Sequence, residues 1–223
     1  MDVDRFLAEL PQLFDDFPGS PQPRGRRFDD VIGGIPNLAE ENVLALLNLA
    51  ASLLGPGESY VEVGTLFGAS LIAASRGNSG DFVAIDNFGF PGSKTRGRDI
   101  PPADRAVLEE NLQRFGAQGA TILEGDAFEL LEGGALGERK VGVYYYDGPH
   151  DEASQERGLR SVEPCLADPA LLVVDDYDWD AVENGTAAYL ASQPQAEKLL
   201  VLPGAEHGSP QWWEGVAVLG WRR

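Results

Sequence analysis

The sequence predicts an α/β protein in which helices cover both faces of a mostly parallel β-sheet. Three observations lead to this prediction. From residue 59 onward, short apolar runs alternate with segments of helical periodicity. The runs are continuously apolar, as in strands that are buried on both faces. The chain of 223 residues is long enough for one domain with a large core.

The N-terminal region is predicted to precede the main domain as a helix and a linker. Apolar residues recur at helical spacing from Val3 to Phe14, which indicates a short first helix. Residues 18–27 hold three prolines and two glycines, which indicates a linker or a strand lying over the body. A second helix is expected to begin near Asn37, because Asn37 can cap it and Glu40 follows three residues later.

Residues 37–223 are expected to form the main domain, with residues 1–36 as the extension. The strand candidates are Tyr60 to Val63, Phe82 to Ile85, Thr121 to Leu123, Val141 to Tyr146, Leu171 to Val174, Leu199 to Leu202 and Val216 to Leu219. The helical segments between them are Ala69 to Ser75, Ala103 to Phe115, Ala127 to Leu131, Glu152 to Cys165 and Ala181 to Ala191. No helical pattern separates the last two strands, which predicts an antiparallel hairpin at the sheet edge.

The composition limits the partners of the protein. Its formal net charge is −19, and so acidic a surface repels nucleic acid and anionic membranes. Small molecules, metal cations and basic partners remain. No apolar run approaches the length of a membrane span, and the acidic start of the chain lacks the order of a signal peptide. The one cysteine, Cys165, fits a reducing compartment, so we predict a cytoplasmic protein.

The first strand runs into the segment Glu62 to Ser70, at the end of the sheet where such folds bind ligands. Gly64 would let the backbone turn sharply near a ligand, and Gly68 would let the next helix approach the strand. An ordinary tight turn is the alternative for both. The dinucleotide fingerprint is not met, because Leu66 stands where a second glycine would make room for a pyrophosphate. The loop favours a ligand without phosphates.

Asp86 ends the second strand, about twenty residues after the glycine loop. An acidic side chain at that place can accept hydrogen bonds from both ribose hydroxyls of an adenosine group. A helix or loop cap is its alternative role. The order of strand, Glu-x-Gly-x-x-x-Gly, strand and Asp together favours an adenosyl ligand.

Four segments, residues 60–70, 84–88, 123–127 and 147–150, resemble successive motifs of class I S-adenosylmethionine-dependent methyltransferases. The nearest group is the small-molecule branch with the macrocin-type O-methyltransferases and the cephalosporin-hydroxylase-like proteins. The resemblance implies a Rossmann-like three-layer sandwich whose seven-stranded, mostly parallel sheet has an antiparallel edge strand. It also implies that the cofactor is bound by Glu62, Gly64, Thr65, Gly68, Ser70, Asp86, Asn87, Asp126, Ala127 and Asp147. From the residues alone, Asp126 could equally cap the helix that follows it.

Three carboxylates follow neighbouring strands of the predicted sheet. Asp147 comes after the fourth strand, and Asp175 and Asp176 come after the fifth, so all three should meet in one crevice. Like charges this close raise each other's pKa unless a cation neutralises them. A hard ion with oxygen ligands, Mg²⁺ or Ca²⁺, would do so. The resemblance to metal-dependent O-methyltransferases implies the same three metal ligands.

Methyl transfer to a hydroxyl needs a group that removes the proton, and His150 is the candidate. Histidine titrates near neutrality, and His150 follows Asp147 by three residues. Its alternative role is to cap the next helix, although Asp151 and Glu152 are better placed for that. The macrocin-type group tends to carry an acid where this chain has Pro149, so the base is an open point. Asp147 and His150 are the predicted catalytic residues.

Three segments are candidates to face the substrate. Residues 87–102 form either a lid or a solvated flexible loop. Residues 204–213 could line a pocket or pack the edge of the core, and Tyr177 and Trp179 follow the acidic pair directly. The polar and aromatic side chains of interest in the first two segments are Lys94, Arg96, Arg98, His207, Trp212 and Trp213.

The sequence thus predicts a metal-assisted O-methyltransferase that acts on a small-molecule hydroxyl. A cephalosporin-hydroxylase-like metal protein is one alternative, although a facial triad would need a second histidine at the site. A catalytically silent adenosyl-binding protein is another, and Leu66 disfavours a nicotinamide oxidoreductase. The first helix and its linker could swap onto a neighbouring chain, which would give a homodimer.

Overall fold

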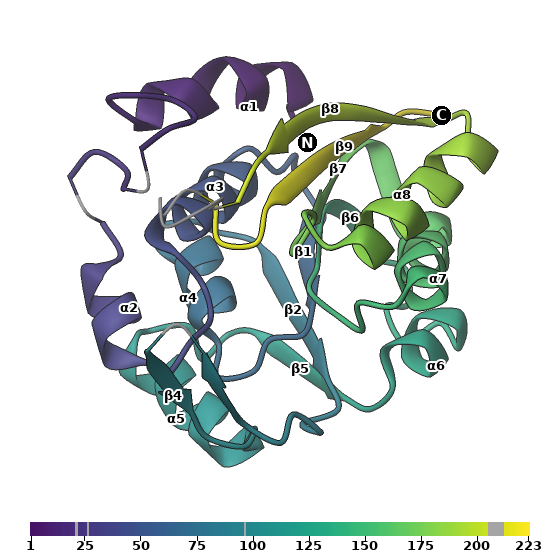
Figure 1. The fold of residues 1–223 in the computed structure, drawn as a ribbon. Helices are drawn as coiled ribbons and strands as arrows, with labels where there is room; N and C mark the ends of the chain where they lie inside the picture. The colour runs from purple at the N-terminus through teal and green to yellow at the C-terminus, as the bar shows by residue number, and fades with distance from the viewer. Residues whose placement is uncertain (21, 26, 96, 205–211) are drawn as a thin grey trace.

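The computed structural model describes residues 1–20, 22–25, 27–95, 97–204 and 212–223. The strands of its main sheet are β1 (Glu58–Val63), β2 (Asp81–Asp86), β5 (Thr121–Glu124), β6 (Lys140–Tyr146), β7 (Leu166–Val174), β8 (Ala196–Leu202) and β9 (Val216–Trp221). They lie in the order β5-β2-β1-β6-β7-β9-β8 (Figure 1). Each contains one of the predicted apolar runs, so the predicted strands are confirmed.

The pairing of the strands places a ligand site at the ends of β1 and β6. β1 is parallel to β2 and β6, while β9 is antiparallel to both β7 and β8. The chain adds β2 and β5 on one side of β1 and then returns to add β6 and β7 on the other. Strand order therefore reverses between β1 and β6, which is where open α/β sheets bind ligands. The N–H of Asp147 donates to the carbonyl of Val63 at 3.0 Å and joins these two strand ends.

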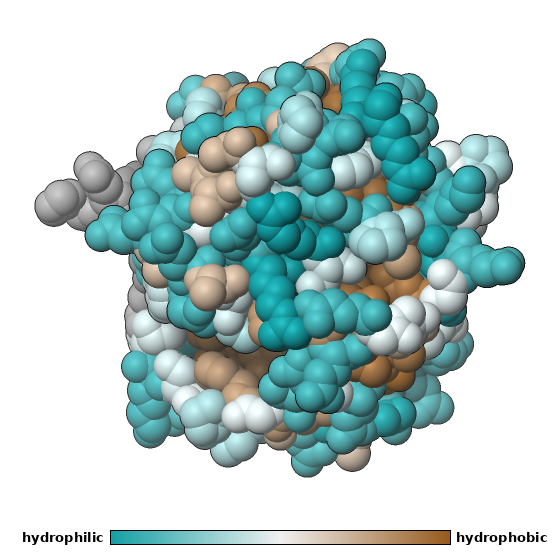
Figure 2. All heavy atoms as spheres, turned by 90° about the vertical axis from the view of Figure 1, so that its right-hand side faces the viewer, coloured by the Kyte–Doolittle hydropathy of each residue, from teal (hydrophilic) through white to brown (hydrophobic). Residues whose placement is uncertain are grey.

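Helices cover both faces of the sheet, which confirms the predicted three-layer sandwich (Figure 1). One face packs against α3 (Glu41–Ser52), α4 (Ala69–Ser75) and α5 (Arg105–Arg114), and the other against α6 (Ala127–Glu132), α7 (Glu152–Val162) and α8 (Asp180–Ser192). Alternate residues serve the two cores: Tyr60 lies in the first cluster and Val61 in the second. The outer surface on the α6–α8 side is mostly hydrophilic (Figure 2). Within the described residues, no helix has the length and apolar character needed to cross a membrane.

The N-terminal residues pack into the first of these two cores. α1 (Val3–Glu9) continues into a short 3₁₀ helix, η1 (Leu10–Leu13), as the helical spacing predicted. The sequence did not predict α2 (Asp29–Gly34). Phe6 and Phe28 are fully buried in the cluster that contains the β1 side chain Tyr60. The extension therefore shares its hydrophobic core with the sheet.

The helix predicted to begin near Asn37 begins four residues later, at Glu41. The side-chain oxygen of Asn37 accepts a hydrogen bond from the N–H of Ala39 at 3.2 Å. Its amide nitrogen donates to the carbonyls of Ile32 and Ile35. The predicted cap was therefore wrong: Asn37 closes the turn that precedes α3, and its side chain has no part in the first turn of the helix.

Candidate active site

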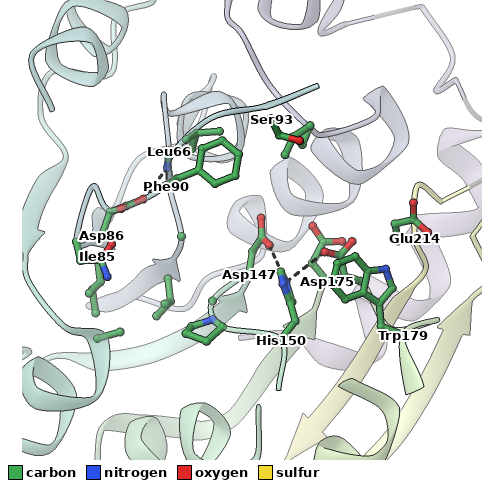
Figure 3. Close-up of a pocket in the computed structure, with 18 of the residues that line it drawn as sticks. Leu66, Ile85, Asp86, Phe90, Ser93, Asp147, His150, Asp175, Trp179 and Glu214 are labelled. Carbon is green, nitrogen blue, oxygen red and sulfur yellow. Dashed lines mark hydrogen bonds and ion pairs between the residues drawn. The ribbon is translucent and has the colours of Figure 1, made fainter. Parts of the chain in front are cut away.

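A cavity of about 510 Å³ opens at the carboxyl ends of β1, β2, β6 and β7. This volume is typical of small-molecule sites, which span roughly 300–1,000 Å³. The loops after these strands and after β5 form most of the wall, and Leu38 and residues just before β9 complete it. Asp86 and Glu214 lie at opposite ends, with Asp147, His150 and Asp175 between them (Figure 3).

Gly64 is the point where β1 meets the loop after β6. Its φ of +85° lies in the left-handed region, and a Cβ at this position would lie 1.9 Å from the carbonyl oxygen of Asp147. Only glycine permits both the turn and the close approach. Gly64 lines the cavity as predicted, but the group that approaches it here is protein backbone.

Asp86 forms the cavity wall at the end of β2. One carboxylate oxygen accepts from the N–H of Leu66 at 2.8 Å, and the other accepts from the N–H of Phe88 at 2.7 Å. Each oxygen keeps a further lone pair for a ligand hydroxyl, since a carboxylate has about four acceptor sites. The neighbouring Asn87 also lines the cavity, and its side chain accepts from the N–H of Gly89.

The loop after β5 forms the adjoining wall. Asp126 lines the cavity and also caps α6, because its side chain accepts from the N–H of Glu129 at 3.0 Å. The structure shows the capping role that the sequence left open for Asp126, and its role in binding a cofactor stays a prediction. Ala127 and Phe128 add apolar surface beside it.

Four of the predicted cofactor-binding residues do not line the cavity. Glu62 is fully buried and accepts hydrogen bonds from the hydroxyls of Tyr60 at 2.8 Å and Ser70 at 3.0 Å. Burial raises the pKa of Glu62 to about 7, although these hydrogen bonds oppose the shift. Thr65 is buried as well, and Gly68 adopts a φ of +89° at the start of α4. Glu62, Thr65, Gly68 and Ser70 therefore belong to the segment around Gly64 without lining the cavity, and their contact with a cofactor stays a prediction.

The acidic cluster lies at the middle of the cavity. The Nε2 atom of His150 is 3.4 Å from an oxygen of Asp147 and 3.2 Å from an oxygen of Asp176. The ligand atoms of these three residues all lie within 4.8 Å of one another, a spacing that could hold a metal ion. Asp175, the third predicted metal ligand, lies outside this group.

Asp175 is held by the adjacent strand. Its Oδ2 accepts a hydrogen bond from the hydroxyl of Tyr145, while its Oδ1 is buried and without a hydrogen-bond partner. Asp176 likewise has a buried oxygen without a partner. Buried polar atoms are normally hydrogen-bonded, so these two oxygens on the wall of a cavity are available to a cation or another ligand.

Burial and crowding disfavour the charged forms of these acids. Burial, with the neighbouring carboxylates of Asp175 and Asp147, raises the pKa of Asp176 to about 8. Burial also raises the pKa of Asp175, although the hydrogen bond from Tyr145 opposes the shift. A bound cation would reverse this preference, because it favours the ionised carboxylates.

His150 is positioned by its neighbours and does not cap α7. The ring centroids of His150 and Trp179 are 5.1 Å apart, and the two rings are tilted by 57°. The cap of α7 is Asp151, as predicted, because its side chain accepts from the N–H of Ser154 at 3.0 Å. Nε2 of His150 is therefore left to face the carboxylates and the cavity.

The segment 87–102 forms a hairpin of β3 (Ser93–Thr95) and β4 (Arg98–Ile100), which neither sequence alternative specified. Phe90, Ser93 and Thr95 line the cavity, so the segment covers the site as a lid would. Two of its basic residues have partners outside the cavity: Lys94 pairs with Asp99, and Arg98 binds the residues before α3. Arg96 lies outside the described residues.

Arg98 connects three parts of the wall. Its guanidinium donates to the carbonyls of Asn37 and Ala39, which flank the cavity residue Leu38. The same group lies 4.9 Å from the ring centroid of Trp213. The hairpin, the segment before α3 and the residues before β9 are thereby held together.

The two tryptophans before β9 have different roles: one packs in the core and the other lines the cavity. Trp212 is fully buried, lies 5.5 Å from Phe14 between ring centroids, and donates its indole N–H to the carbonyl of Pro18. Trp213 lines the cavity. Trp179 also lines it, whereas Tyr177 is buried and is not among the lining residues. The nearby His207 lies outside the described residues.

The methyltransferase-domain family matches residues 61–177, more than half of the chain. The chain belongs to this family. No curated protein is similar enough in sequence to count as a relative. The match covers the glycine loop, Asp86, Asp126, Asp147 and the acidic pair, and it confirms the prediction of a class I S-adenosylmethionine-dependent methyltransferase.

Solved structures share the fold of this methyltransferase at low sequence identity. An O-methyltransferase from Streptomyces achromogenes involved in tomaymycin synthesis, solved with S-adenosylmethionine, is 18% identical, with all of both chains covered and a TM-score of 0.63. A Podospora anserina methyltransferase bound to S-adenosylhomocysteine is 14% identical, with 99% of this chain and 95% of that chain covered and a TM-score of 0.60. An O-methyltransferase from Bacillus cereus with the same ligand is 13% identical, with 81% and 79% covered and a TM-score of 0.56.

The strained backbone of the methyltransferase is concentrated at its cavity. Among the described non-glycine residues, positive φ angles near 50° occur at Leu66, Phe88, Asp176 and Trp213. Three of them line the cavity, and Phe88 follows the lining residue Asn87. Such conformations cost roughly 1–3 kcal/mol each and persist only where the surroundings enforce them. The walls of the site are therefore held rigidly in place.

Sequence reasoning missed Glu214 and Leu38 as residues of the methyltransferase's cavity, and it selected the segment that contains Phe90 without singling out that residue. All three lie in connections whose path the apolar pattern does not specify. The only signal for Glu214 was its place beside a tryptophan pair and before the last strand.

Proposed function

We propose that this methyltransferase transfers the methyl group of S-adenosylmethionine to a hydroxyl of a small molecule, assisted by a divalent cation. The observation that carries the proposal is that one cavity contains both Asp86, which is placed to bind an adenosyl group, and the acidic residues at the ends of β6 and β7. Two of these acids, Asp175 and Asp176, have buried oxygens without a hydrogen-bond partner. The solved neighbours described as O-methyltransferases, two of them with the cofactor or its product bound, support the choice of reaction.

The cavity fits S-adenosylmethionine by the chemistry of its wall. Asp86 has free acceptor sites for the ribose hydroxyls, and Ala127 with Phe128 offers apolar surface for the adenine. Leu66 fills the place where a pyrophosphate would need a glycine. The described lining residues include no lysine or arginine, which also disfavours a phosphate ligand.

The acidic cluster fits a divalent cation. Mg²⁺ is usually held by one or two carboxylates together with water and substrate oxygens. Asp147 and Asp176 would supply these carboxylates, with Ca²⁺ as the other hard ion suited to them. When bound, the cation would orient the acceptor and lower the pKa of its hydroxyl. Tyr145 would hold Asp175 beside this pair through its hydrogen bond.

His150 is the residue that would receive the proton of the acceptor hydroxyl. Its Nε2 faces the cavity, and Asp147 and Asp176 would stabilise the imidazolium that forms. In the transfer, the carbon–sulfur bond breaks as the carbon–oxygen bond forms, and S-adenosylhomocysteine leaves as a neutral thioether. The walls would align the acceptor oxygen, the methyl group and the sulfur in one line.

The proposal is tested by following transfer of a labelled methyl group to a panel of phenols, catechols and sugars. We expect transfer with Mg²⁺, its loss in chelator, and its recovery when Mg²⁺ is restored. Asp176→Asn should lower kcat/KM at least ~100-fold, as removal of a group that touches the reacting centre does. Asp180→Asn, an exposed acid at the start of α8, is the matched control and should retain activity.

The outcomes separate the parts of the proposal. Undiminished transfer in chelator would overturn the role of the metal but not methyl transfer. Binding of S-adenosylhomocysteine without transfer to any hydroxyl would favour a silent adenosyl-binding protein. For His150→Gln, a low kcat that recovers as the acceptor ionises at high pH would support the base, whereas loss of Mg²⁺ binding would make His150 a ligand instead.

A further inference from the structure

We infer that the N-terminal extension, residues 1–36, supports the acceptor wall of this methyltransferase, and that Trp212 is the positioning residue through which it acts. Trp212 is not among the lining residues, but the next two residues, Trp213 and Glu214, are. The inference rests on the proposed function and adds a positioning residue to it. It concerns the end of the cavity away from Asp86, where Glu214 lies (Figure 3).

Trp212 is packed against side chains of the extension. It is fully buried, and its ring lies edge-on to those of Phe14 and Phe17, with centroids 5.5 and 6.2 Å away. Its indole N–H donates to the carbonyl of Pro18 at 2.9 Å, a hydrogen bond that spans 194 positions of the sequence. Edge-to-face ring pairs stabilise a contact beyond the area that they bury. The extension therefore contributes directly to the position of Trp212.

The turn after Trp212 connects this contact to the cavity. The carbonyl of Trp212 accepts from the N–H of Gly215 at 2.7 Å, which closes a tight turn around the two cavity residues. Within this turn Trp213 has a φ of +51°, a conformation that persists only where the surroundings enforce it. The backbone of the two cavity residues therefore depends on where Trp212 is held.

The same turn is bonded to the loop that carries the acidic pair. The carbonyl of Glu214 accepts from the N–H of Asp178 at 2.8 Å. The carbonyl of Gly215 accepts from the N–H of Tyr177 at 3.0 Å. Because Tyr177 directly follows Asp176, these bonds set the distance between the turn and the acidic cluster. An acceptor bound at the cluster would be enclosed by a wall that the extension supports from behind.

The cofactor wall is fixed by bonds within the sheet and its loops. Asp86 accepts from the N–H groups of Leu66 and Phe88, and the N–H of Gly64 donates to the carbonyl of Ile85 at 2.9 Å. A change in the contact between the extension and Trp212 should therefore weaken binding of the acceptor and leave binding of the cofactor unchanged.

Trp212→Phe tests the inference, with Trp221→Phe as the matched control. Trp221 is also buried, but it lies on β9 at the end away from the cavity, where it pairs with Ala170 and Ala196. Kinetics are measured on the full chain with Mg²⁺ and the best acceptor of the panel. In Trp212→Phe we expect the KM for the acceptor to rise about tenfold, as loss of a hydrogen bond and of ring contacts would give, with kcat changed less than about twofold.

The affinity for S-adenosylhomocysteine should stay constant in Trp212→Phe, and the control should match the wild type in all of these quantities. If Trp212→Phe fails to fold by circular dichroism, Phe17→Leu takes its place, because Phe17 is only half-buried. This variant loses one ring pair with Trp212, so the KM for the acceptor should rise about threefold.

Hydrogen exchange tests the support of the wall without any acceptor. The amides of Asp178 and Gly215 should exchange at least about tenfold faster in Trp212→Phe, because their hydrogen bonds hold the turn in place. The amide of Gly64 at the cofactor wall should exchange as in the wild type. The control should leave all three amides unchanged.

An equal loss of affinity for S-adenosylhomocysteine, or unchanged exchange at the turn, would overturn the inference. Faster exchange at the turn in a protein that methylates no acceptor would support the role of the extension in holding this wall and contradict the proposed function. Methyl transfer with the same KM in the wild type and in the variant would overturn the inference and leave the proposed function standing.

Discussion

Replacing Gly64 with alanine tests how the site is built, because it adds one methyl group at the contact between β1 and β6. The new Cβ would lie 1.9 Å from the carbonyl oxygen of Asp147, whereas such contacts are essentially never shorter than 3.0 Å. The backbone segments at Gly64 and Asp147 would have to separate by about 1 Å, the difference between these distances. That movement would stretch the backbone hydrogen bond between Asp147 and Val63.

The expected cost has three parts. Alanine at a φ of +85° costs roughly 1–2 kcal/mol. Weakening the hydrogen bonds at the strand ends adds roughly 1 kcal/mol, and residual strain at the contact adds about as much again. Gly64→Ala should therefore destabilise the protein by about 3–4 kcal/mol.

Gly77→Ala is the matched control for this measurement. Gly77 has a φ of +72°, and nothing lies within 4 Å of the position its Cβ would take. Only the backbone cost of roughly 1–2 kcal/mol should appear there. Urea unfolding of both variants gives the difference in free energy. Equal losses would refute the argument that the approach of Asp147 requires glycine.

Three further predictions follow. Tyr145→Phe removes the hydrogen bond to Asp175 and should lower the free energy of unfolding by about 1–3 kcal/mol in urea denaturation. An unchanged midpoint of unfolding would contradict this prediction. In metal-free buffer the free energy of unfolding should fall as pH rises towards 8, because the folded state raises the pKa of Asp176 from 3.8 to about 8 and so stabilises the protonated form. In Asp176→Asn the free energy of unfolding should depend less steeply on pH. A variant with the same pH profile as the wild type would contradict the assignment of this dependence to Asp176. Arg98→Lys keeps the charge but loses the planar guanidinium group that lies over Trp213. The KM for the acceptor should therefore rise about tenfold, while the affinity for S-adenosylhomocysteine stays constant. An equal loss of affinity for S-adenosylhomocysteine would contradict this prediction.

The sheet and the positions of the acids could be predicted because the sequence signals are local. Strands buried on both faces are continuously apolar, and the carboxyl ends of parallel strands share one edge of the sheet. Asp86 and Asp147 line the cavity for this reason.

The detailed geometry of the cluster depends on information that spacing does not carry. Asp175 and Asp176 are adjacent in sequence, but a φ of +51° at Asp176 and the hydrogen bond from Tyr145 to Asp175 send the two side chains to different partners. The group of possible metal ligands therefore contains His150 where the sequence suggested Asp175.

The far wall of the cavity could not be predicted for a topological reason. Leu38 precedes the first strand of the sheet, and Glu214 follows β8, almost at the other end of the chain. Arg98 joins these regions through contacts across more than 50 residues, which no local pattern reveals.

Calorimetric titration with S-adenosylhomocysteine tests most directly whether the cavity binds an adenosyl ligand through Asp86. We predict one binding site per chain, an affinity at least about tenfold weaker in Asp86→Asn, and no heat of binding with NAD⁺. Binding of NAD⁺ in place of S-adenosylhomocysteine, or equal affinity in the variant, would contradict the account.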